Sequence, residues 1–329
     1  MNYKRIVYSL VLVVLLGILA GCGQTKETTT PTKTEQRVIR IGYQMGSANI
    51  ILARSKGWFE DEFAKDGIQV KYDMFLAGAP MNEAMAGNRI DITSVGNLPA
   101  LAAKAAGIDA KIIGRASSDK HYYALLTKPN STIAAAKDLK GKKIAVQVGS
   151  GAHLFLFLLL HQNGLKPADV NIVNLPAPDQ QTALETGNVD AIAAWQPWIA
   201  TIESSGIGQV LVDSEHVVQS VGVYLARNDF TSQNPDLIER FLKVHQRTAE
   251  FIRNHPQEAV EIIAKETKLP AAALTKAYQS IDWDIKITDE DVKTLKDSKD
   301  FLIQTNVLKK DFDVNELIDK RFTDKVGVK

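Results

Sequence analysis

The hydrophobic and polar positions of the chain predict an alternation of strands and helices that occurs twice, about 100 positions apart. In the first copy the apolar runs predict strands at 38–43, 68–72 and 92–95, separated by helices at 50–65 and 81–85. The second copy predicts strands at 143–147, 170–175 and 191–195, separated by helices at 154–160 and 180–185. Each copy is a βαβαβ unit, which favours a parallel sheet covered by helices. We expect an α/β protein with two such sheets in two lobes, and one large doubly wound sheet is the alternative.

The segments that follow each copy predict how the lobes are joined. Extended stretches at 121–127 and 221–226 are the expected crossovers. From Asn234 and Pro235 onward the pattern is helical with an apolar stripe, and Thr288 opens a capping-box-like start of a later helix. This helical part is expected to cover the first sheet. We therefore expect lobe 1 to comprise residues 37–120 and 224–329 and lobe 2 to comprise residues 121–223, with a cleft between them.

An apolar stretch near the N-terminus predicts a lipoprotein signal peptide over residues 1–22. Lys4 and Arg5 precede an uncharged run that ends in Leu-Ala-Gly-Cys, a lipobox. The run is shorter than the roughly 20 apolar residues of a membrane-spanning helix, although an uncleaved anchor helix is the alternative. Cys22 is therefore the predicted lipid attachment point, and the Thr-rich residues 23–36 are a predicted flexible tether. The protein is expected on the extracytoplasmic face of the cell membrane, held by its lipid.

The composition of the chain argues against several classes of partner and of reactive site. Lys and Arg total 39 against 38 for Asp and Glu, without a basic cluster, so nucleic acid is not an expected partner. Cys22 is the only cysteine, which leaves none for a disulfide or a thiolate nucleophile once it carries lipid. The six histidines are scattered along the sequence, so we expect neither a metal nor a cofactor. We also expect a monomer.

The loops after the predicted strands are rich in Gly, Ser, Asn and Pro, and in open α/β sheets ligands bind at these strand ends. Small residues and helix N-termini there favour an anionic head group held by neutral donors. We expect Ser150 and His153 in the lobe 2 half of the site and Asn97 in the lobe 1 half. Trp195 follows the last strand of lobe 2 and is expected to cover an apolar part of the ligand, with Trp198 as the second candidate.

Catalytic interpretations are weak by comparison. Ser150 lies near His153, but its flanking residues lack the glycine spacing of a nucleophile elbow, and no acid is placed to orient the histidine. No phosphate-binding loop or dinucleotide fingerprint follows a predicted strand. A binding protein is therefore expected rather than an enzyme. A signalling ectodomain or a regulator would need a second membrane helix or a DNA-binding helix pair, and neither is visible in the sequence.

The chain resembles the substrate-binding lipoproteins of ATP-driven (ABC) importers in the nitrate, sulfonate and taurine family, over nearly the whole mature sequence. Segments that carry the resemblance are 41–44, 56–59, 87–91, 139–146, 149–153, 187–191, 195–197, 212–215 and 226–230. The resemblance implies a type II periplasmic-binding-protein fold, closure on a small molecule and delivery to a membrane permease. It also implies that ligand-site loops contain Gln44, Ser47, Gly78, Asn97, Ser150, His153 and Trp195.

One departure bears on the ligand. Where taurine-like members carry a carboxylate for the ligand's amine, this chain has Val221-Gly222-Val223, so an amine would lack a partner unless Asp179 or Glu215 supplies it. An aliphatic sulfonate fits better, while nitrate, taurine and thiamine-precursor pyrimidines stay alternatives. The same fold hosts a cysteine-rich pyrimidine-forming enzyme, and a single cysteine argues against that class here.

Overall fold

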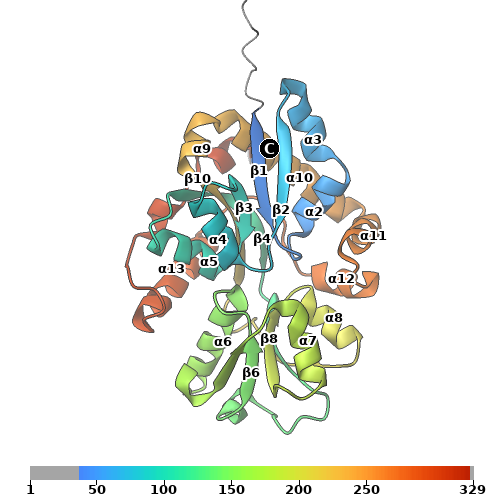
Figure 1. Cartoon of the computed structure of the whole chain (residues 1–329), viewed down its shortest axis with the longest axis vertical. Helices are drawn as coiled ribbons and strands as arrows, with labels where there is room; N and C mark the ends of the chain where they lie inside the picture. The colour runs from blue at the N-terminus through green and yellow to red at the C-terminus, as the bar shows by residue number, and fades with distance from the viewer. Residues whose placement is uncertain (1–36, 327–329) are drawn as a thin grey trace, which may run out of the picture. The chain divides into compact units, whose positions relative to one another are not determined.

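The computed structural model describes residues 37–326, and Figure 1 shows the arrangement of its helices and strands. The predicted signal peptide, the tether and Cys22 lie outside the described residues. Within 37–326, no helix combines the length and the apolar character that a membrane span requires.

The first sheet has five strands in the order β2-β1-β3-β10-β4. Its parallel part comes from the first βαβαβ unit, with β1 (Val38–Tyr43) between β2 (Gln69–Met74) and β3 (Ile92–Val95). The later strand β10 (Ser220–Arg227) runs antiparallel between β3 and β4 (Ala110–Asp119). The chain therefore completes this sheet only after it has built the second one.

The second sheet repeats this plan in the order β7-β6-β8-β5-β9. Its parallel part is β6 (Lys143–Val146), between β7 (Asn171–Asn174) and β8 (Ala191–Trp195). Antiparallel to β8 runs β5 (Tyr123–Thr127), which also pairs with β9 (Gln209–Asp213). Two sheets rather than one are thus confirmed. The parallel arrangement expected from the repeats holds for three neighbouring strands of each sheet. One antiparallel strand, β10 or β5, follows them, and the edge strand beyond it, β4 or β9, again runs in the direction of the first three.

The duplication is visible in matching hydrogen bonds. In the first copy, Asp91 follows a Gly-Asn turn, and its carboxylate accepts from the backbone N–H of Arg40 in β1 at 2.9 Å. In the second copy, Asp190 occupies the same position and accepts from the N–H of Lys143 in β6 at 2.8 Å. The aspartate that follows the Gly-Asn turn, in Gly-Asn-Arg-Ile-Asp of the first copy and in Gly-Asn-Val-Asp of the second, therefore ties the start of the third strand to the start of the first in each unit.

Helices cover both sheets, and we call each sheet with its helices a lobe. The helices of the first lobe are α2 (Ala48–Ser55), α3 (Trp58–Phe63), α4 (Gly78–Ala86), α5 (Asn97–Ala105), α9 (Asn228–Gln233), α10 (Pro235–Asn254), α11 (Pro256–Thr267), α12 (Ala271–Tyr278), α13 (Asp289–Gln304) and α14 (Arg321–Val326). Those of the second lobe are α6 (Gly151–Gln162), α7 (Ala177–Glu185) and α8 (Trp198–Ser204). The helix predicted over 50–65 is divided at Gly57, whose φ of 68° interrupts the helical path.

The C-terminal helices pack on the first lobe, as the pattern predicted. Phe241 of α10 stacks on Phe59 of α3 at a ring distance of 5.2 Å, within one buried apolar cluster that includes β1. In addition, α12 contacts α8 of the second lobe, where Lys276 and Glu203 form an ion pair at 2.8 Å. The predicted boundary between 223 and 224 falls inside β10, because that strand pairs with β4 from Ser220 onward. The division into lobes at the predicted positions stays a prediction.

Candidate ligand-binding site

A cavity of about 60 Å³ lies where the two lobes face each other. It is lined from the first lobe by Gln44, Gly46, Ser47, Asn49, Gly78, Ser94, Val95, Gly96, Pro99, Ser117, Ser220, Gly222 and Trp283. Tyr122, Tyr123, Ser150, Gly151 and Trp195 line it from the second lobe and the connection that leads into it. Seven of these residues carry hydroxyl groups and, within the described part of the chain, none carries a charge.

Four helices begin at this cavity. Ser47 precedes α2, Gly78 opens α4, Gly96 precedes α5 and Ser150 precedes α6, and all four residues line the cavity. The first N–H groups of a helix have no partner within the helix and carry the positive end of its dipole. Helix starts that meet at one point create a site for an anion without a charged side chain.

Ser150 has a double role at the start of α6. Its Oγ accepts from the backbone N–H of His153 at 3.3 Å, so it caps the helix. Because a hydroxyl oxygen can accept while its hydrogen donates elsewhere, Ser150 can cap α6 and still donate into the cavity.

The tyrosines of the connection supply two further hydroxyl groups. Burial raises the pKa of Tyr122 and raises that of Tyr123 to about 12, so both phenols stay neutral and able to donate at pH 7. The Tyr123 hydroxyl accepts from Ser220 Oγ at 3.1 Å, which links the start of the second lobe to β10 of the first.

Two glycines allow the cavity walls to approach closely. A Cβ atom on Gly151 would lie 2.2 Å from the Tyr123 hydroxyl oxygen, and one on Gly78 would lie 2.4 Å from the Cβ of Pro99. Neither contact is possible for a real side chain, so the helix starts at these positions require glycine. The backbone N–H groups can thereby face the ligand directly.

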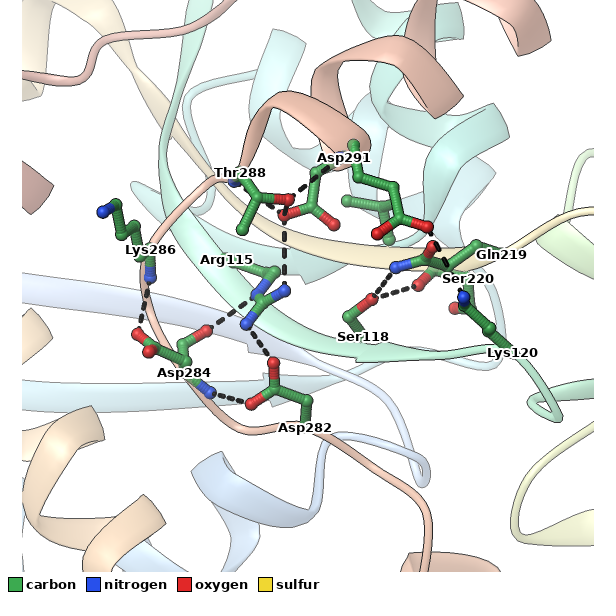
Figure 2. Close-up of polar contacts among 12 residues, drawn as sticks. Arg115, Ser118, Lys120, Gln219, Ser220, Asp282, Asp284, Lys286, Thr288 and Asp291 are labelled. Atoms are coloured by element: carbon green, nitrogen blue, oxygen red, sulfur yellow. Dashed lines mark hydrogen bonds and ion pairs between the residues drawn. The ribbon is translucent and has the colours of Figure 1, made fainter.

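The wall formed by Trp283 is held by Arg115 of β4. Figure 2 shows Arg115 pointing into the segment 282–291, where its Nε donates to the Asp284 carbonyl at 2.9 Å and its other nitrogens contact Asp282 and Asp291. The β4 backbone also pairs with this segment, since Arg115 N–H donates to the Ile285 carbonyl at 2.8 Å. Arg115 is 4% exposed, and its guanidinium group pairs with this segment and does not line the cavity.

The predicted capping box at the start of α13 is confirmed and belongs to the same cluster. Thr288 Oγ1 accepts from the Asp291 N–H at 3.1 Å, while the Asp291 carboxylate accepts from the Thr288 N–H at 2.8 Å. Beside it, Gln219 donates to Ser118 Oγ at 2.5 Å and Ser118 donates to the Ser220 carbonyl at 3.2 Å (Figure 2). These bonds fix the start of β10, which carries Ser220 and Gly222 into the cavity wall.

Of the seven ligand-site residues named from the sequence, five line the cavity: Gln44, Ser47, Gly78, Ser150 and Trp195. Asn97 and His153 do not. Asn97 is fully buried and binds the β10 backbone, accepting from the Val221 N–H at 2.8 Å and donating to the Gln219 carbonyl at 3.2 Å. It positions β10 rather than facing the cavity.

His153 lies behind Ser150 in the first turn of α6. Its Nδ1 accepts from the Gly149 N–H at 3.3 Å, and its ring packs on Phe157 at 4.2 Å. Burial lowers the pKa of His153 to about 4, so the imidazole is neutral at pH 7. A neutral His153 steadies the Gly149 to Ser150 turn and adds no charge to the site.

Three residues of the cavity wall lie outside the repeated loops and were not predicted. Ser117 and Ser220 belong to the antiparallel strands β4 and β10, and Trp283 comes from the segment between α12 and α13. The break in apolar periodicity at Ser117-Ser118 was a signal for β4, but the sequence held none for Trp283.

An apolar annex of about 30 Å³ adjoins the cavity and shares Gln44 and Trp195 with it. Its other lining residues are Met45, Met74, Phe75, Leu76, Pro178 and Trp198. Met74 and Leu76 are 53% and 56% exposed, which places them among the few large apolar side chains on the surface of the described residues. Trp195 therefore stands between a polar cavity and an apolar one, and Trp198 faces the apolar one alone.

Acidic side chains are absent from both compartments within the described residues. Neither Asp179 nor Glu215, the acids considered for a ligand amine, lines the cavity or the annex. At Gly222, a Cβ would lie 2.7 Å from Ser117 Oγ, so the packing there also excludes a carboxylate side chain unless Ser117 moves.

Comparison with known proteins places these features in a family. Residues 44–259 match the model of the NMT1/THI5-like family. An aliphatic sulfonates-binding protein of Bacillus subtilis (strain 168) is 35% identical over 318 residues, covering 96% of this chain and 95% of that protein. A taurine-binding periplasmic protein of Escherichia coli (strain K12) is 31% identical over 210 residues, covering 62% of this chain and 63% of that protein.

A solved structure agrees with this assignment. The periplasmic aliphatic sulphonate binding protein SsuA from Escherichia coli has a TM-score of 0.77 and 29% identity, over 87% of this chain and 98% of that chain. All three relatives are named as binding proteins and two of them as periplasmic, which confirms the predicted class and fold. The chain belongs to the NMT1/THI5-like family and is a substrate-binding protein with the periplasmic-binding-protein fold.

Proposed function

We propose that this chain is the lipid-anchored binding protein of an ABC importer and that it captures an aliphatic sulfonate between its lobes. The observation that carries the proposal is the pairing of a neutral, donor-rich cavity with an apolar annex, separated by Trp195. A sulfonate with a carbon chain has the matching two halves, a charged head group and an apolar tail.

The head group fits the cavity because its donors are uncharged and numerous. A sulfonate spreads one negative charge over three oxygens, so several hydroxyl and helix N–H donors can share it. The hydroxyl groups of Ser47, Ser150 and Ser220, together with the starts of α2, α4 and α6, are the proposed donors. Such donors hold an anion without the strong charge pairing that would hinder release to a permease.

Two alternative ligands fit the site less well. Taurine carries an ammonium group, and the described cavity and annex contain no carboxylate to pair with it, so burying the amine would cost several kcal/mol. Nitrate has no apolar part, so it would leave the annex unused and gain nothing from Trp195.

A calorimetric titration panel tests the ligand class. Ethanesulfonate, hexanesulfonate, taurine, nitrate and sulfate are each titrated into the purified protein. We expect saturable binding of both sulfonates, with hexanesulfonate the tighter, and at least about tenfold weaker binding of taurine, which corresponds to 1.4 kcal/mol. Tight binding of nitrate or taurine, with weak binding of hexanesulfonate, would overturn the proposal.

The anchor is proposed from the sequence alone. The lipobox makes Cys22 the attachment point of the lipid, with residues 23–36 as the tether and the folded part acting as a monomer beside the permease. Cys22→Ala should accumulate as unprocessed precursor that incorporates no labelled fatty acid. Normal processing and labelling of this variant would refute the anchor while leaving the ligand proposal intact.

A further inference from the structure

The two segments that join the lobes lie side by side and are tied together by one buried serine. The first segment leads from β4 into β5 and contains His121, and the second leaves β9 and contains Ser214. Ser214 is fully buried, donates its hydroxyl to the Lys120 carbonyl at 2.7 Å and accepts from the Tyr123 N–H at 3.1 Å. The positions of the residues next to Ser214 are therefore fixed against the first segment.

Asp213 and Glu215 flank Ser214 and direct their carboxylates to the same side as His121. His121 Nδ1 lies 2.8 Å from Asp213 Oδ2. One ligand atom from each of His121, Asp213 and Glu215 falls within 4.8 Å of the other two. The Glu215 N–H donates to Asp213 Oδ1 at 3.1 Å, which turns the second carboxylate oxygen of Asp213 toward the imidazole.

The surroundings of this cluster are electrostatically negative. Asp119 accepts from the His121 backbone N–H at 2.9 Å, so three carboxylates gather around one imidazole. The nearby Lys120 is paired instead with Glu290 at 3.5 Å.

We propose that His121, Asp213 and Glu215 form a binding site for a divalent transition cation, with Zn²⁺ as the best match. One imidazole nitrogen and two carboxylate oxygens are ligands that Zn²⁺ accepts, and a tetrahedral site requires ligand atoms about 3.4 Å apart. His121 Nδ1 and Asp213 Oδ2 are 2.8 Å apart, and each of the three ligand atoms lies within 4.8 Å of the others, so modest side-chain rotations would bring them to that spacing.

A fourth ligand is available from His216 or from water. His216 Nε2 lies 3.8 Å from Glu215 Oε2, and its side chain is 90% exposed and free to turn. Sequence spacing could not reveal the site, because His121 and Asp213 are 92 positions apart and meet only through the pairing of β5 with β9. None of the three proposed ligands lines the cavity or the annex, so the proposal is independent of the proposed ligand.

A bound cation would join the two inter-lobe segments by strong bonds. Because it would bind the folded chain and not the separated segments, it should raise the temperature of unfolding in a concentration-dependent way. A hard cation such as Ca²⁺ prefers six to eight oxygen ligands and should bind far more weakly to a site that offers an imidazole and two carboxylates.

The test uses the purified protein after dialysis against a chelator, titrated with Zn²⁺ and, separately, with Ca²⁺ by calorimetry. We expect one Zn²⁺ per chain, and binding at least about tenfold weaker in His121→Gln and in Glu215→Gln. Both substituted side chains are exposed, and thermal unfolding of the metal-free variants verifies that they fold. His255→Gln, which removes an exposed histidine remote from the cluster, is the matched control and should bind Zn²⁺ like the original chain.

Three outcomes would overturn the proposal. The first is Zn²⁺ binding that does not saturate near one per chain, and the second is unchanged Zn²⁺ affinity in both cluster variants. The third is Ca²⁺ binding as tight as Zn²⁺ binding and unaffected by His121→Gln, which would reduce the cluster to a group of surface acids. A sulfonate titration of the same samples reports separately on the proposed ligand.

Discussion

The hydroxyl oxygen of Ser150 accepts a hydrogen bond from the backbone N–H of His153 at 3.3 Å while the same residue lines the ligand cavity. This contact makes one side chain responsible for two measurable properties, the stability of α6 and the proposed binding of an anion. Substitutions at this position can separate them.

Ser150→Ala should weaken sulfonate binding by about 1.5 to 3 kcal/mol, because a donor to a charged oxygen is lost. It should also lower the free energy of unfolding by about 1 kcal/mol through loss of the cap. Ser150→Asp is the matched variant, because Asp caps as well as Ser but places a negative charge against the sulfonate. Calorimetry and urea unfolding should therefore show a stable Ser150→Asp protein without sulfonate affinity. Unchanged affinity in Ser150→Ala would limit Ser150 to its capping role.

The parallel core of each lobe was predictable from sequence because its signals are local. Apolar periodicity and the Gly-Asn turns before Asp91 and Asp190 place both aspartates correctly, and their bonds to the first strand of each unit follow from that repeat. Loops at parallel strand ends were likewise predictable, which is why Ser47, Gly78 and Ser150 were identified as lining residues.

The positions of the other site residues depend on pairing between distant segments of the chain, which no local sequence pattern encodes. Asn97 begins α5, where a side-chain amide could face a ligand. Its side chain instead accepts a hydrogen bond from the Val221 N–H of β10, 124 positions later. Trp283 reaches the cavity only because Arg115 and the β4 backbone hold its segment across 169 positions. The meeting of His121 with Asp213 has the same origin.

A buried histidine in the first lobe predicts a loss of stability in acid. His245 is 1% exposed, and its Nε2 donates to the Trp283 carbonyl at 2.8 Å, so Nδ1 is the acceptor for the Tyr224 hydroxyl at 2.8 Å. Burial lowers the pKa of His245 to about 4. Between the unfolded-state value near 6.5 and about 4 the unfolded chain binds the extra proton, so stability falls as pH falls through that window.

His245 alone should therefore contribute a slope of up to about 1.4 kcal/mol per pH unit between pH 6.5 and 4. Urea unfolding at a series of pH values measures this slope, and His245→Gln should reduce it at the expense of overall stability. His216→Gln is the control, since its side chain is 90% exposed and should leave the slope unchanged. Equal slopes for His245→Gln and the original chain would show that other groups cause the acid sensitivity.

The tight packing around Gly46 predicts that a side chain at this position would hold the lobes apart and weaken ligand binding. A Cβ at this position would lie 2.9 Å from the Tyr122 hydroxyl oxygen and 3.2 Å from the Gln196 carbonyl oxygen. Gly46→Val should therefore oppose closure and weaken binding by about 1 to 3 kcal/mol, the usual cost of overpacking. Small-angle scattering should show that ligand contracts the original chain but contracts the variant less.

Gly87→Ala provides the control for Gly46, because a Cβ at Gly87 meets no atom closer than 3.4 Å and the position is remote from the cavity. Its affinity and its contraction should match those of the original chain. If Gly46→Val also binds normally, the contact between Gly46 and the second lobe is not formed in the ligand-bound state.

The position of Trp195 predicts that affinity rises with the length of the ligand's carbon chain. It lines both the polar cavity and the apolar annex, so a carbon chain that leaves the head group must pass its indole. Each methylene buried there contributes about 0.8 kcal/mol, and affinity should rise about fourfold per methylene from ethanesulfonate until the annex is filled. Trp195→Ala should flatten this rise while affecting ethanesulfonate least, because the lost contact lies with the tail.

Trp58→Phe, which alters an indole outside both compartments, should keep the full chain-length dependence, and calorimetry across the series compares the three proteins. A wild-type series with equal affinities, or a Trp195→Ala series as steep as the original, would show that the annex does not hold the ligand and would favour a small anion bound by the cavity alone.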